Sequence, residues 1–358
     1  MRKETRKISV GTIAIGGDAP VSIQSMTSVP LEDVSATIDQ VQRLEEAGAE
    51  IIRLALRNED AVHHLEDILK NTTAVISGDI HFNYKIAIKA IEAGIHKIRI
   101  NPGNIGGSER VKEVVAAARD YGVPIRVGVN GGSIDEKKYG FNAEGLVASA
   151  MEQIHILEDE NFENIIVSLK TSDIRLTVDA NELFSTKRNY PLHIGLTEAG
   201  FGDDCIINST LAIGTLLMKG IGDTIRVSLT GDPVDEIPIA QKILEGAGYR
   251  QKRIKIVSCP TCGRTDPDID LPSIAKEVED ICNEKFMKKL GDQNKSLTIA
   301  VMGCEVNGPG EASHADAGLA GGHNNSMILF SSGKKIKKIE IKDAVDSLIL
   351  EIESIMNK

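Results

Sequence analysis

A regular alternation of short strand-like runs with helix-like segments constrains the fold of this 358-residue chain more than any other feature. Runs of β-branched and aliphatic residues recur eight times, at 21–25, 51–54, 74–79, 97–100, 125–129, 165–169, 192–196 and 224–229. Most segments between them carry apolar residues at helical spacing, as in Val34, Ile38, Val41 and Leu44. Several end at a glycine, which a left-handed helix cap favours. The pattern predicts an α/β protein with an N-terminal (β/α)8 TIM-type barrel, and an open doubly wound sheet is the alternative.

A second unit follows the barrel pattern, so we expect the domains to occupy residues 1–250 and 251–358. Within the second unit, residues 253–258 and 297–302 are predicted strands, with helices near 271–290 and over 339–356. If the two strands are parallel neighbours in a β-α-β unit, the residues that follow them lie at the same edge of one sheet. The sequence thus predicts a smaller α/β domain behind the barrel.

The charge and cysteine content exclude several classes of protein. The formal net charge is −11, whereas nucleic acids and anionic membranes require a basic surface. No apolar run approaches the length of a membrane span, and the charged N-terminus lacks the apolar core of a signal peptide. Five cysteines in 358 residues do not form a disulfide framework, so we expect a cytoplasmic protein.

Two short motifs in the second unit carry thiolates that are suited to metal binding. The first, at 258–264, contains Cys259 and Cys262, and the second, at 302–311, contains Cys304 and Glu311. A structural zinc site uses four closed ligands, whereas a [4Fe–4S] cluster on three thiolates leaves one iron free for chemistry. A zinc-dependent barrel hydrolase with His314 as the fourth ligand and a non-catalytic iron–sulfur carrier remain alternatives. A radical-SAM barrel is disfavoured because its cysteine run is missing.

Basic residues recur at matching positions in the barrel strands. Four strands carry Ile-Arg followed by an aliphatic residue and a fifth ends in lysine, which places five cations at Arg53, Arg99, Arg126, Lys170 and Arg226. A charged side chain inside an apolar strand is unfavourable unless it is paired or points into a polar mouth, which barrels form at their strand C-termini. Pairing with nearby carboxylates is the alternative for any single residue. Together, the five cations and the loop at 101–107 favour a site for a doubly phosphorylated small molecule.

Other polar residues lie at the same ends of the predicted strands. Asp79, His81, His193 and Glu198 are candidate acids or bases, although a lone histidine in a strand is more often structural. The same rim carries three neutral polar residues, Asn130, Thr197 and Ser228. Ser228 lies two residues beyond Arg226 and therefore on the same face of the strand.

These motifs together resemble the 4-hydroxy-3-methylbut-2-enyl diphosphate synthases of the bacterial, two-domain type. The resemblance extends over most of the chain, at 24–27, 79–82, 99–106, 126–130, 192–200, 226–230, 259–264 and 302–311. It implies reductive ring opening and dehydroxylation of 2-C-methyl-D-erythritol 2,4-cyclodiphosphate to 4-hydroxy-3-methylbut-2-enyl diphosphate, a step of non-mevalonate isoprenoid synthesis. It also implies a [4Fe–4S] cluster, two single-electron transfers from ferredoxin or flavodoxin, and a homodimer.

The resemblance also assigns roles to individual residues. It gives the cluster three thiolates, Cys259, Cys262 and Cys304, and places the carboxylate of Glu311 on the fourth iron. It gives the diphosphate a clamp formed by Arg53, Arg99, Arg126 and Lys170, flanked by Asn130, Arg226 and Ser228. It places Glu198 near the reacting carbons and lines the same mouth with Asp79, His81, His193 and Thr197. Two positions depart from the expected family pattern, Glu305 and Gly78, and neither removes a ligand.

Overall fold

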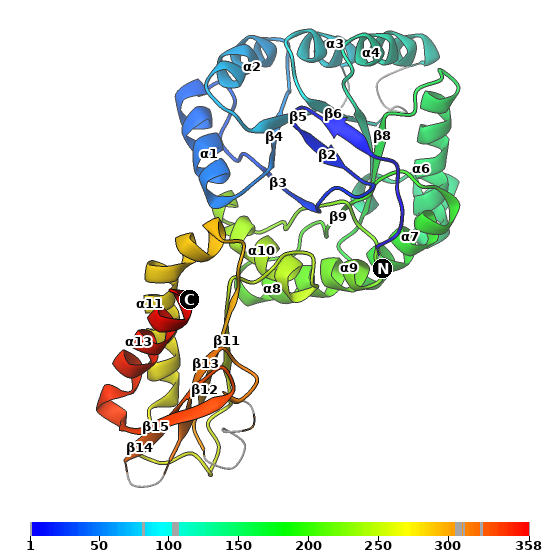
Figure 1. Cartoon of the computed structure of the whole chain (residues 1–358). Helices are drawn as coiled ribbons and strands as arrows, with labels where there is room; N and C mark the ends of the chain where they lie inside the picture. The colour runs from blue at the N-terminus through cyan, green and yellow to red at the C-terminus, as the bar shows by residue number, and fades with distance from the viewer. Residues whose placement is uncertain are drawn as a thin grey trace. The chain divides into compact units, whose positions relative to one another are not determined.

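The computed structural model describes residues 2–80, 83–101, 107–304, 310, 312–322 and 325–357. The chain divides into two compact units, Met1–Arg250 and Gln251–Lys358, which we call unit 1 and unit 2. Both are drawn in Figure 1 and are described separately below. Within the described ranges, no helix is long and apolar enough to cross a membrane.

Unit 1 is a barrel of eight parallel strands. They are β3 (Ser22–Met26), β4 (Ile51–Ala55), β5 (Val75–Asp79), β6 (Lys97–Ile100), β7 (Ile125–Asn130), β8 (Ile165–Lys170), β9 (His193–Ile194) and β10 (Thr224–Ile225). Their order is β8-β7-β6-β5-β4-β3-β10-β9. The two end strands also meet, through a parallel bridge between Val167 and Leu192 and a 2.9 Å bond from the Val167 N–H to the Pro191 carbonyl. This contact closes the sheet, which confirms the predicted barrel and excludes the open sheet.

Helices cover the outside of the strands, as Figure 1 shows. They are α1 (Val34–Ala47), α2 (Asp60–Lys70), α3 (Tyr84–Glu92), α4 (Ser108–Asp120), α5 (Glu136–Tyr139), α6 (Ala143–Glu158), α7 (Ile174–Lys187), α8 (Gly202–Ser209), α9 (Thr215–Met218) and α10 (Glu236–Gly246), with a π-helical turn over Thr210–Gly214. Helix α1 illustrates how the sequence sets their limits. The Asp33 side chain accepts from the Ala36 N–H at the start, and Gly48 ends the helix at φ 105°. Val41 and Leu44 are fully buried against the strands.

A short N-terminal hairpin packs against the starts of the barrel strands. It consists of β1 (Ile8–Val10) and β2 (Ile13–Ile15), which the sequence pattern did not predict. Its buried side chains form one apolar cluster with Ile51, Val75 and Ile166, which stand at the beginnings of β4, β5 and β8. Figure 1 shows β2 inside the ring of helices. Since this hairpin covers the N-terminal ends of the strands, the functional mouth is expected at their C-terminal ends.

Two barrel strands are shorter than predicted. Strands were expected over 192–196 and 224–229, but β9 and β10 comprise two residues each. Beyond them, the Arg226 N–H still bonds to the Ile194 carbonyl at 3.1 Å. A Cβ on Gly195 would lie only 2.4 Å from the Arg226 carbonyl oxygen, so the chains approach more closely here than paired strands with side chains allow. The regular hydrogen-bond ladder between β9 and β10 therefore ends early, and the residues that follow reach the C-terminal end of the barrel without regular strand pairing.

Unit 2 contains a five-stranded sheet with helices packed against it. Its elements are β11 (Ile254–Ser258), α11 (Leu271–Asp292), β12 (Leu297–Met302), β13 (Ala317–Gly321), β14 (Ser326–Ser331), β15 (Lys334–Glu340) and α13 (Ala344–Met356). The strand order is β11-β12-β13-β14-β15. Strands β11 and β12 are parallel neighbours, as predicted, while β14 is antiparallel to both β13 and β15. Buried residues of α11 and α13, including Val278 and Leu348, form a core with the sheet.

The predicted helix over 339–356 is wrong at its start. Ile339 pairs with Met327 in the β14–β15 ladder, and α13 begins only at Ala344. The helical apolar spacing starts after residue 340, whereas the preceding Lys334–Glu340 segment is an exposed edge strand. Lysine is a residue that proteins place on sheet edges to prevent further strand pairing.

Candidate active site

A cavity at the C-terminal ends of the barrel strands gathers most of the predicted substrate residues. It has a volume of about 110 Å³. Its lining comprises Arg53, Asp79, Arg99, Arg126, Asn130, Ser168, Lys170, Thr197, Arg226 and Ser228. All five predicted cations are therefore in one place, although they come from five different strands or strand ends. We call this site the basic cavity.

Two buried carboxylates orient three of the cations. Asp79 lies 3.1 Å from the Arg99 guanidinium and 3.7 Å from that of Arg53. Glu236, at the start of α10, lies 3.1 Å from the Arg226 guanidinium and accepts a 2.8 Å bond from the Ser25 hydroxyl. These pairs hold the guanidinium groups in place before any ligand binds.

Arg126 and Lys170 have no carboxylate ion pair within the described part of the chain. They are 2% and 6% exposed, and the Arg126 Nε has no hydrogen-bond partner there. Burial, followed by the charges of Arg53 and Arg99, lowers the pKa of Arg126, and burial followed by Arg126 lowers the pKa of Lys170. Within the described structure, five cations thus have two carboxylates as ion-pair partners, and an anion in the cavity would relieve their mutual repulsion.

Glu198 directly follows Thr197, which lines the basic cavity, and is not itself part of the lining. Its side chain is exposed, and its backbone has φ 54°, a left-handed conformation that non-glycine residues rarely adopt. Such strain is frequently found at functional sites. Three residues before Glu198, Gly195 leaves room for the Lys170 ammonium beside the backbone. A Cβ on Gly195 would lie only 2.8 Å from the Lys170 Nζ.

His193 lies inside the barrel and does not line the cavity. Its side chain is fully buried, and neither ring nitrogen has a hydrogen-bond partner among the described residues. Burial, followed by the charge of Lys170, lowers the pKa of His193 well below its usual value. Both effects favour the neutral imidazole.

Sequence reasoning missed two charged residues of this region. Glu236 follows an Asp-Pro turn at a helix start, and Lys97 is the first residue of β6 and fully buried. Lys97 precedes Arg99 by two residues, so strand alternation alone would have placed both on the same face.

Several predicted residues lie outside the described part of the chain. They are His81, residues 102–106 of the loop at 101–107, Glu305 and Glu311.

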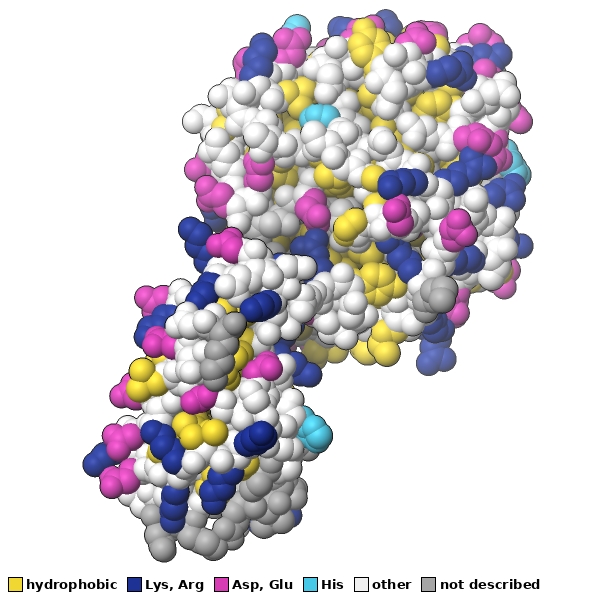
Figure 2. All heavy atoms as spheres, in the orientation of Figure 1, with side chains coloured by type: hydrophobic (Ala, Val, Ile, Leu, Met, Phe, Trp, Pro, Cys, Tyr) yellow, Lys and Arg dark blue, Asp and Glu magenta, His cyan; other side chains and the backbone are white. Residues whose placement is uncertain are grey.

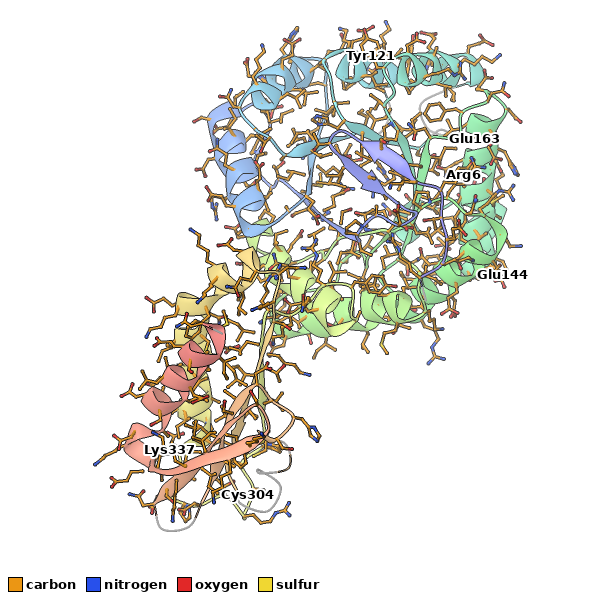
Figure 3. The ribbon with its side chains drawn as sticks, viewed as in Figure 1. Arg6, Tyr121, Glu144, Glu163, Cys304 and Lys337 are labelled. Atoms are coloured by element: carbon orange, nitrogen blue, oxygen red, sulfur yellow. The ribbon has the colours of Figure 1, made fainter. Side chains whose placement is uncertain are left out.

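The three predicted cluster cysteines lie at one edge of the unit 2 sheet. Cys259 follows β11 and Cys304 follows β12, and these strands are parallel and in register. The Gly303 N–H lies 3.4 Å from the Cys259 sulfur, and Figure 3 shows Cys304 beside the sheet. Backbone and then guanidinium hydrogen bonds from Arg264 lower the pKa of Cys262. The hydrogen bond to Cys262, followed by the charges of Cys262 and Cys304, raises the pKa of Arg264. The topology thus brings Cys259 and Cys304 to one edge, and Arg264 links Cys262 to Cys304.

These thiols are not arranged as a finished metal site. Within the described ranges, no group of three His, Cys, Asp or Glu side chains is placed to hold a metal ion, and His314 is exposed. Nevertheless, the donors suit an iron–sulfur group, because three soft thiolates at one sheet edge are accompanied by a guanidinium that stabilises negative charge.

The other two cysteines are buried in the interiors of their units. Cys205 on α8 has its sulfur 3.8 Å from the Ser209 hydroxyl, and Cys282 on α11 belongs to the apolar core of unit 2. No disulfide joins any of the five cysteines in the described structure.

The sequence matches known families over nearly its whole length. The GcpE TIM-barrel domain matches residues 5–241, and the GcpE protein C-terminal domain matches residues 255–354. The 4-hydroxy-3-methylbut-2-en-1-yl diphosphate synthase (flavodoxin) of Clostridium perfringens is 49% identical over 358 residues, covering 99% of each chain. The protein of the same name from Geobacter sulfurreducens is 47% identical over 360 residues, again covering 99% of each.

Solved structures of other enzymes share the fold at low sequence identity. Dihydropteroate synthase from Stenotrophomonas maltophilia superimposes with a TM-score of 0.52 at 15% identity, covering 67% of this chain and 98% of that one. N-acetylneuraminic acid synthetase from Leptospira borgpetersenii gives 0.51 at 13% identity, covering 80% and 99%. At these identities the similarity shows the fold alone.

Proposed function

This chain belongs to the GcpE family, and we propose that its basic cavity binds a cyclic diphosphate while its unit 2 cysteines hold a [4Fe–4S] cluster. Its relatives are named 4-hydroxy-3-methylbut-2-en-1-yl diphosphate synthase (flavodoxin). The reaction is the reductive ring opening of 2-C-methyl-D-erythritol 2,4-cyclodiphosphate, with loss of a hydroxyl as water. The observation that carries the substrate assignment is that, among the described residues, five cations gather at the barrel mouth and only two buried carboxylates form ion pairs with them.

Each cation of the basic cavity has a distinct part in binding. Arg53 and Arg99 are held by Asp79, so they present their remaining N–H groups with little loss of conformational freedom. Arg126 and Lys170 carry no competing carboxylate pair in the described structure and interact with the diphosphate most strongly. A charge-assisted hydrogen bond contributes about 1.5–3 kcal/mol, so this pair supplies much of the affinity.

We assign the proton donor of the reaction to Glu198. The departing hydroxyl must take up a proton to leave as water, and Glu198 supplies a carboxyl group next in sequence to the cavity residue Thr197, in an exposed and strained turn. Its exposure lets it exchange protons with solvent between turnovers. Glu198→Gln keeps the size of the side chain and removes the acid, so full turnover by this variant would contradict the assignment.

The redox centre is assigned to unit 2. Cys259, Cys262 and Cys304 are the thiolates, and Glu311, outside the described residues, is assigned as the fourth ligand. When bound, the cluster supplies the two electrons of the reaction, one at a time. Flavodoxin is the electron donor, as the names of the relatives state for those proteins. Arg264 stabilises the negative charge of the thiolates through its hydrogen bond to Cys262.

We further propose that the protein is a cytoplasmic homodimer. Cysteines that form no disulfides suit a reducing compartment. Unit 1 exposes a group of large apolar side chains around α8 and α9, namely Phe201, Ile206, Ile207, Leu211 and Met218. Figure 2 shows hydrophobic side chains gathered along this edge of unit 1, and such a patch is typical of a protein interface. A catalytically active monomer in sedimentation would refute the dimer.

The first test is anaerobic purification followed by absorbance and EPR spectroscopy and by iron, sulfide and zinc analysis. We expect a brown protein with about four irons and four sulfides per chain. A colourless protein that stays iron-free after reconstitution but carries one zinc would instead support the zinc hydrolase and overturn the redox assignment.

A further inference from the structure

The interior of the barrel beneath the basic cavity is polar, although barrel interiors are dominated by bulky aliphatic residues. Six residues from five strands make up this region, which we call the polar layer: Ser22, Gln24, Ser77, Lys97, His193 and Thr224. Each is at most 3% exposed. Below the layer lie the apolar residues that pack on the N-terminal hairpin, so it is sealed from that end.

Strand register and one hydrogen bond connect the members of the polar layer. Thr224 pairs with Ser22 on one side and His193 on the other, and Ser77 pairs with Lys97 and Arg53. The Lys97 Nζ donates a 2.8 Å bond to the Gln24 Oε1. Because β3 and β6 are three strands apart, that bond crosses the barrel interior. Lys97 precedes Arg99 by two residues and therefore lies about 6–7 Å deeper than the cavity wall.

Lys97 lacks the partner that a buried ammonium requires. It is fully buried, and its one hydrogen bond within the described structure goes to a neutral amide. The charged groups that act on it are Arg53 and Arg126, both cations. Its other titratable neighbour is His193, which is itself surrounded by Lys170, Arg126, Lys97 and Arg53. The nearest strands do carry one carboxylate, Asp79, but this is paired with Arg53 and Arg99.

A buried lysine in such surroundings is neutral in a larger fraction of molecules than an exposed one. Burial is the first cause that lowers the pKa of Lys97, followed by the charges of Arg126 and Arg53. A diphosphate in the basic cavity would place negative charge one layer above it, which favours the protonated form. His193 is a weaker candidate for this proton, because burial and then the charges of Lys170 and Arg126 lower its pKa, and no acceptor in the described structure holds either of its N–H positions.

We propose that Lys97 is a proton-binding site beneath the basic cavity, which takes up one proton from solvent when a diphosphate binds above it. The amine of the free protein becomes an ammonium, so the net positive charge under the ligand rises only when the ligand is present. This inference rests on the proposed function to the extent that the cavity binds a cyclic diphosphate. It gives the barrel a way to limit cation repulsion when the cavity holds no anion.

Linkage fixes the sign of the pH effect. The pKa of Lys97 is higher with the ligand than without it, so the ligand binds more tightly when Lys97 is already protonated. Affinity is therefore greatest below the pKa of the free protein and falls as pH rises towards the pKa of the complex. Within that window the dissociation constant rises by up to about tenfold per pH unit for one proton taken up.

The test is calorimetric titration of the oxidised holoenzyme with the cyclodiphosphate, without an electron donor so that no turnover occurs. Each phosphate of this ring carries a single, strongly acidic group, so the ligand does not titrate between about pH 6 and 9. Titrations in Tris and in HEPES, which differ in ionisation enthalpy, give the number of protons taken up. We expect about one proton for the wild-type protein and about one fewer for Lys97→Met.

Three further variants test whether the proton uptake is specific to Lys97. Lys70→Met removes an exposed lysine of α2 and should leave the uptake unchanged, and so should His193→Gln. Lys97→Arg carries a permanent charge and should bind without a proton contribution from this position. If Lys97→Met does not fold, the wild-type proton count and its pH dependence still test the proposal.

Each remaining outcome overturns a stated claim. Cyclodiphosphate binding without proton uptake contradicts the Lys97 proposal and leaves the proposed function intact. Unchanged uptake in Lys97→Met, or its loss in His193→Gln, assigns the proton elsewhere. No binding by the wild-type holoenzyme contradicts the proposed substrate site and, with it, this inference.

Discussion

In unit 1 the functional side chains stand on strands, whereas in unit 2 the thiols stand in the segments that follow strands. Arg53, Arg99 and Arg126 each occupy a ladder position whose register fixes where the side chain points. Cys262 lies outside any strand and is exposed, and Cys304 comes two residues after β12 ends. The cation site is therefore preorganised by its backbone, and the thiol site depends more on the group that it holds.

This difference has an energetic consequence. Buried cations without full pairing are unfavourable in the free protein, so the barrel must supply that free energy from its apolar core and helices. The thiols are under no such constraint, because a metal group contributes folding free energy itself when it binds. Substitutions in the two units should therefore change different properties.

The largest effect is expected for Cys304→Ser in unit 2. A hydroxyl is a far weaker iron ligand than a thiolate, so we expect loss of the cluster absorbance and of all detectable activity. Cyclodiphosphate binding by the barrel should remain within about threefold of the wild-type affinity. Iron analysis and calorimetry check the two parts, and loss of both cluster and binding would show that the units are not independent.

Glu198→Gln should give the next largest effect. General acid catalysis contributes about 10²–10⁴-fold, so kcat should fall by roughly that factor while iron content and cyclodiphosphate affinity stay nearly unchanged. Steady-state kinetics with an artificial reductant measures kcat without the flavodoxin step. Glu198→Gly is the control for the backbone, because glycine adopts φ 54° without strain and should raise the free energy of unfolding by about 0.5–1 kcal/mol.

Arg126→Met should weaken binding and preserve the fold. Loss of one charge-assisted contact predicts about a 10- to 100-fold lower affinity for the cyclodiphosphate. The free energy of unfolding should not fall, because the substitution removes a buried charge that has no carboxylate ion pair in the described structure. Calorimetry and chemical denaturation measure the two quantities.

Arg99→Met is the matched comparison for Arg126→Met. It removes the guanidinium that lies 3.1 Å from the buried Asp79, whereas Arg53 lies at 3.7 Å, so we expect a loss of stability of about 3–5 kcal/mol in addition to weaker binding. Equal stability losses in the two variants would contradict the distinction between paired and unpaired cations.

Much of this architecture could be predicted from sequence because its signals are local and periodic. The recurring Ile-Arg-aliphatic pattern placed four arginines at equivalent strand positions, and the structure lines one cavity with them. The β11–β12 pairing followed from a strand–helix–strand pattern with a cysteine after each strand. In both cases the spacing of residues along the sequence and the direction of the strands were sufficient to predict which side chains lie together.

The parts that were missed depend on three-dimensional contacts. The β1–β2 hairpin is recognisable only through its packing on Ile51, Val75 and Ile166, which are far away in sequence. Helix α13 was predicted too long because Ile339 fits a helical stripe, although it pairs with Met327 in a strand. His193 was placed at the mouth by the family resemblance, yet its side chain is fully buried and does not line the basic cavity.

The smallest effect should come from the two buried cysteines outside the thiol edge, one in each unit. Cys282 belongs to the apolar core of unit 2, and burial raises its pKa to about 11, so the thiol stays protonated and unreactive at neutral pH. Serine there would place a hydroxyl among the apolar side chains of the unit 2 core, and we expect Cys282→Ser to lower the free energy of unfolding by about 1–3 kcal/mol. Cys205 in unit 1 already lies 3.7 Å from the Ser228 carbonyl oxygen, which a hydroxyl can use, so Cys205→Ser should lower it by less than about 1 kcal/mol. Urea denaturation of both variants measures the difference, and a larger loss for Cys205→Ser would mean that packing, and not hydrogen bonding, decides the tolerance of these sites.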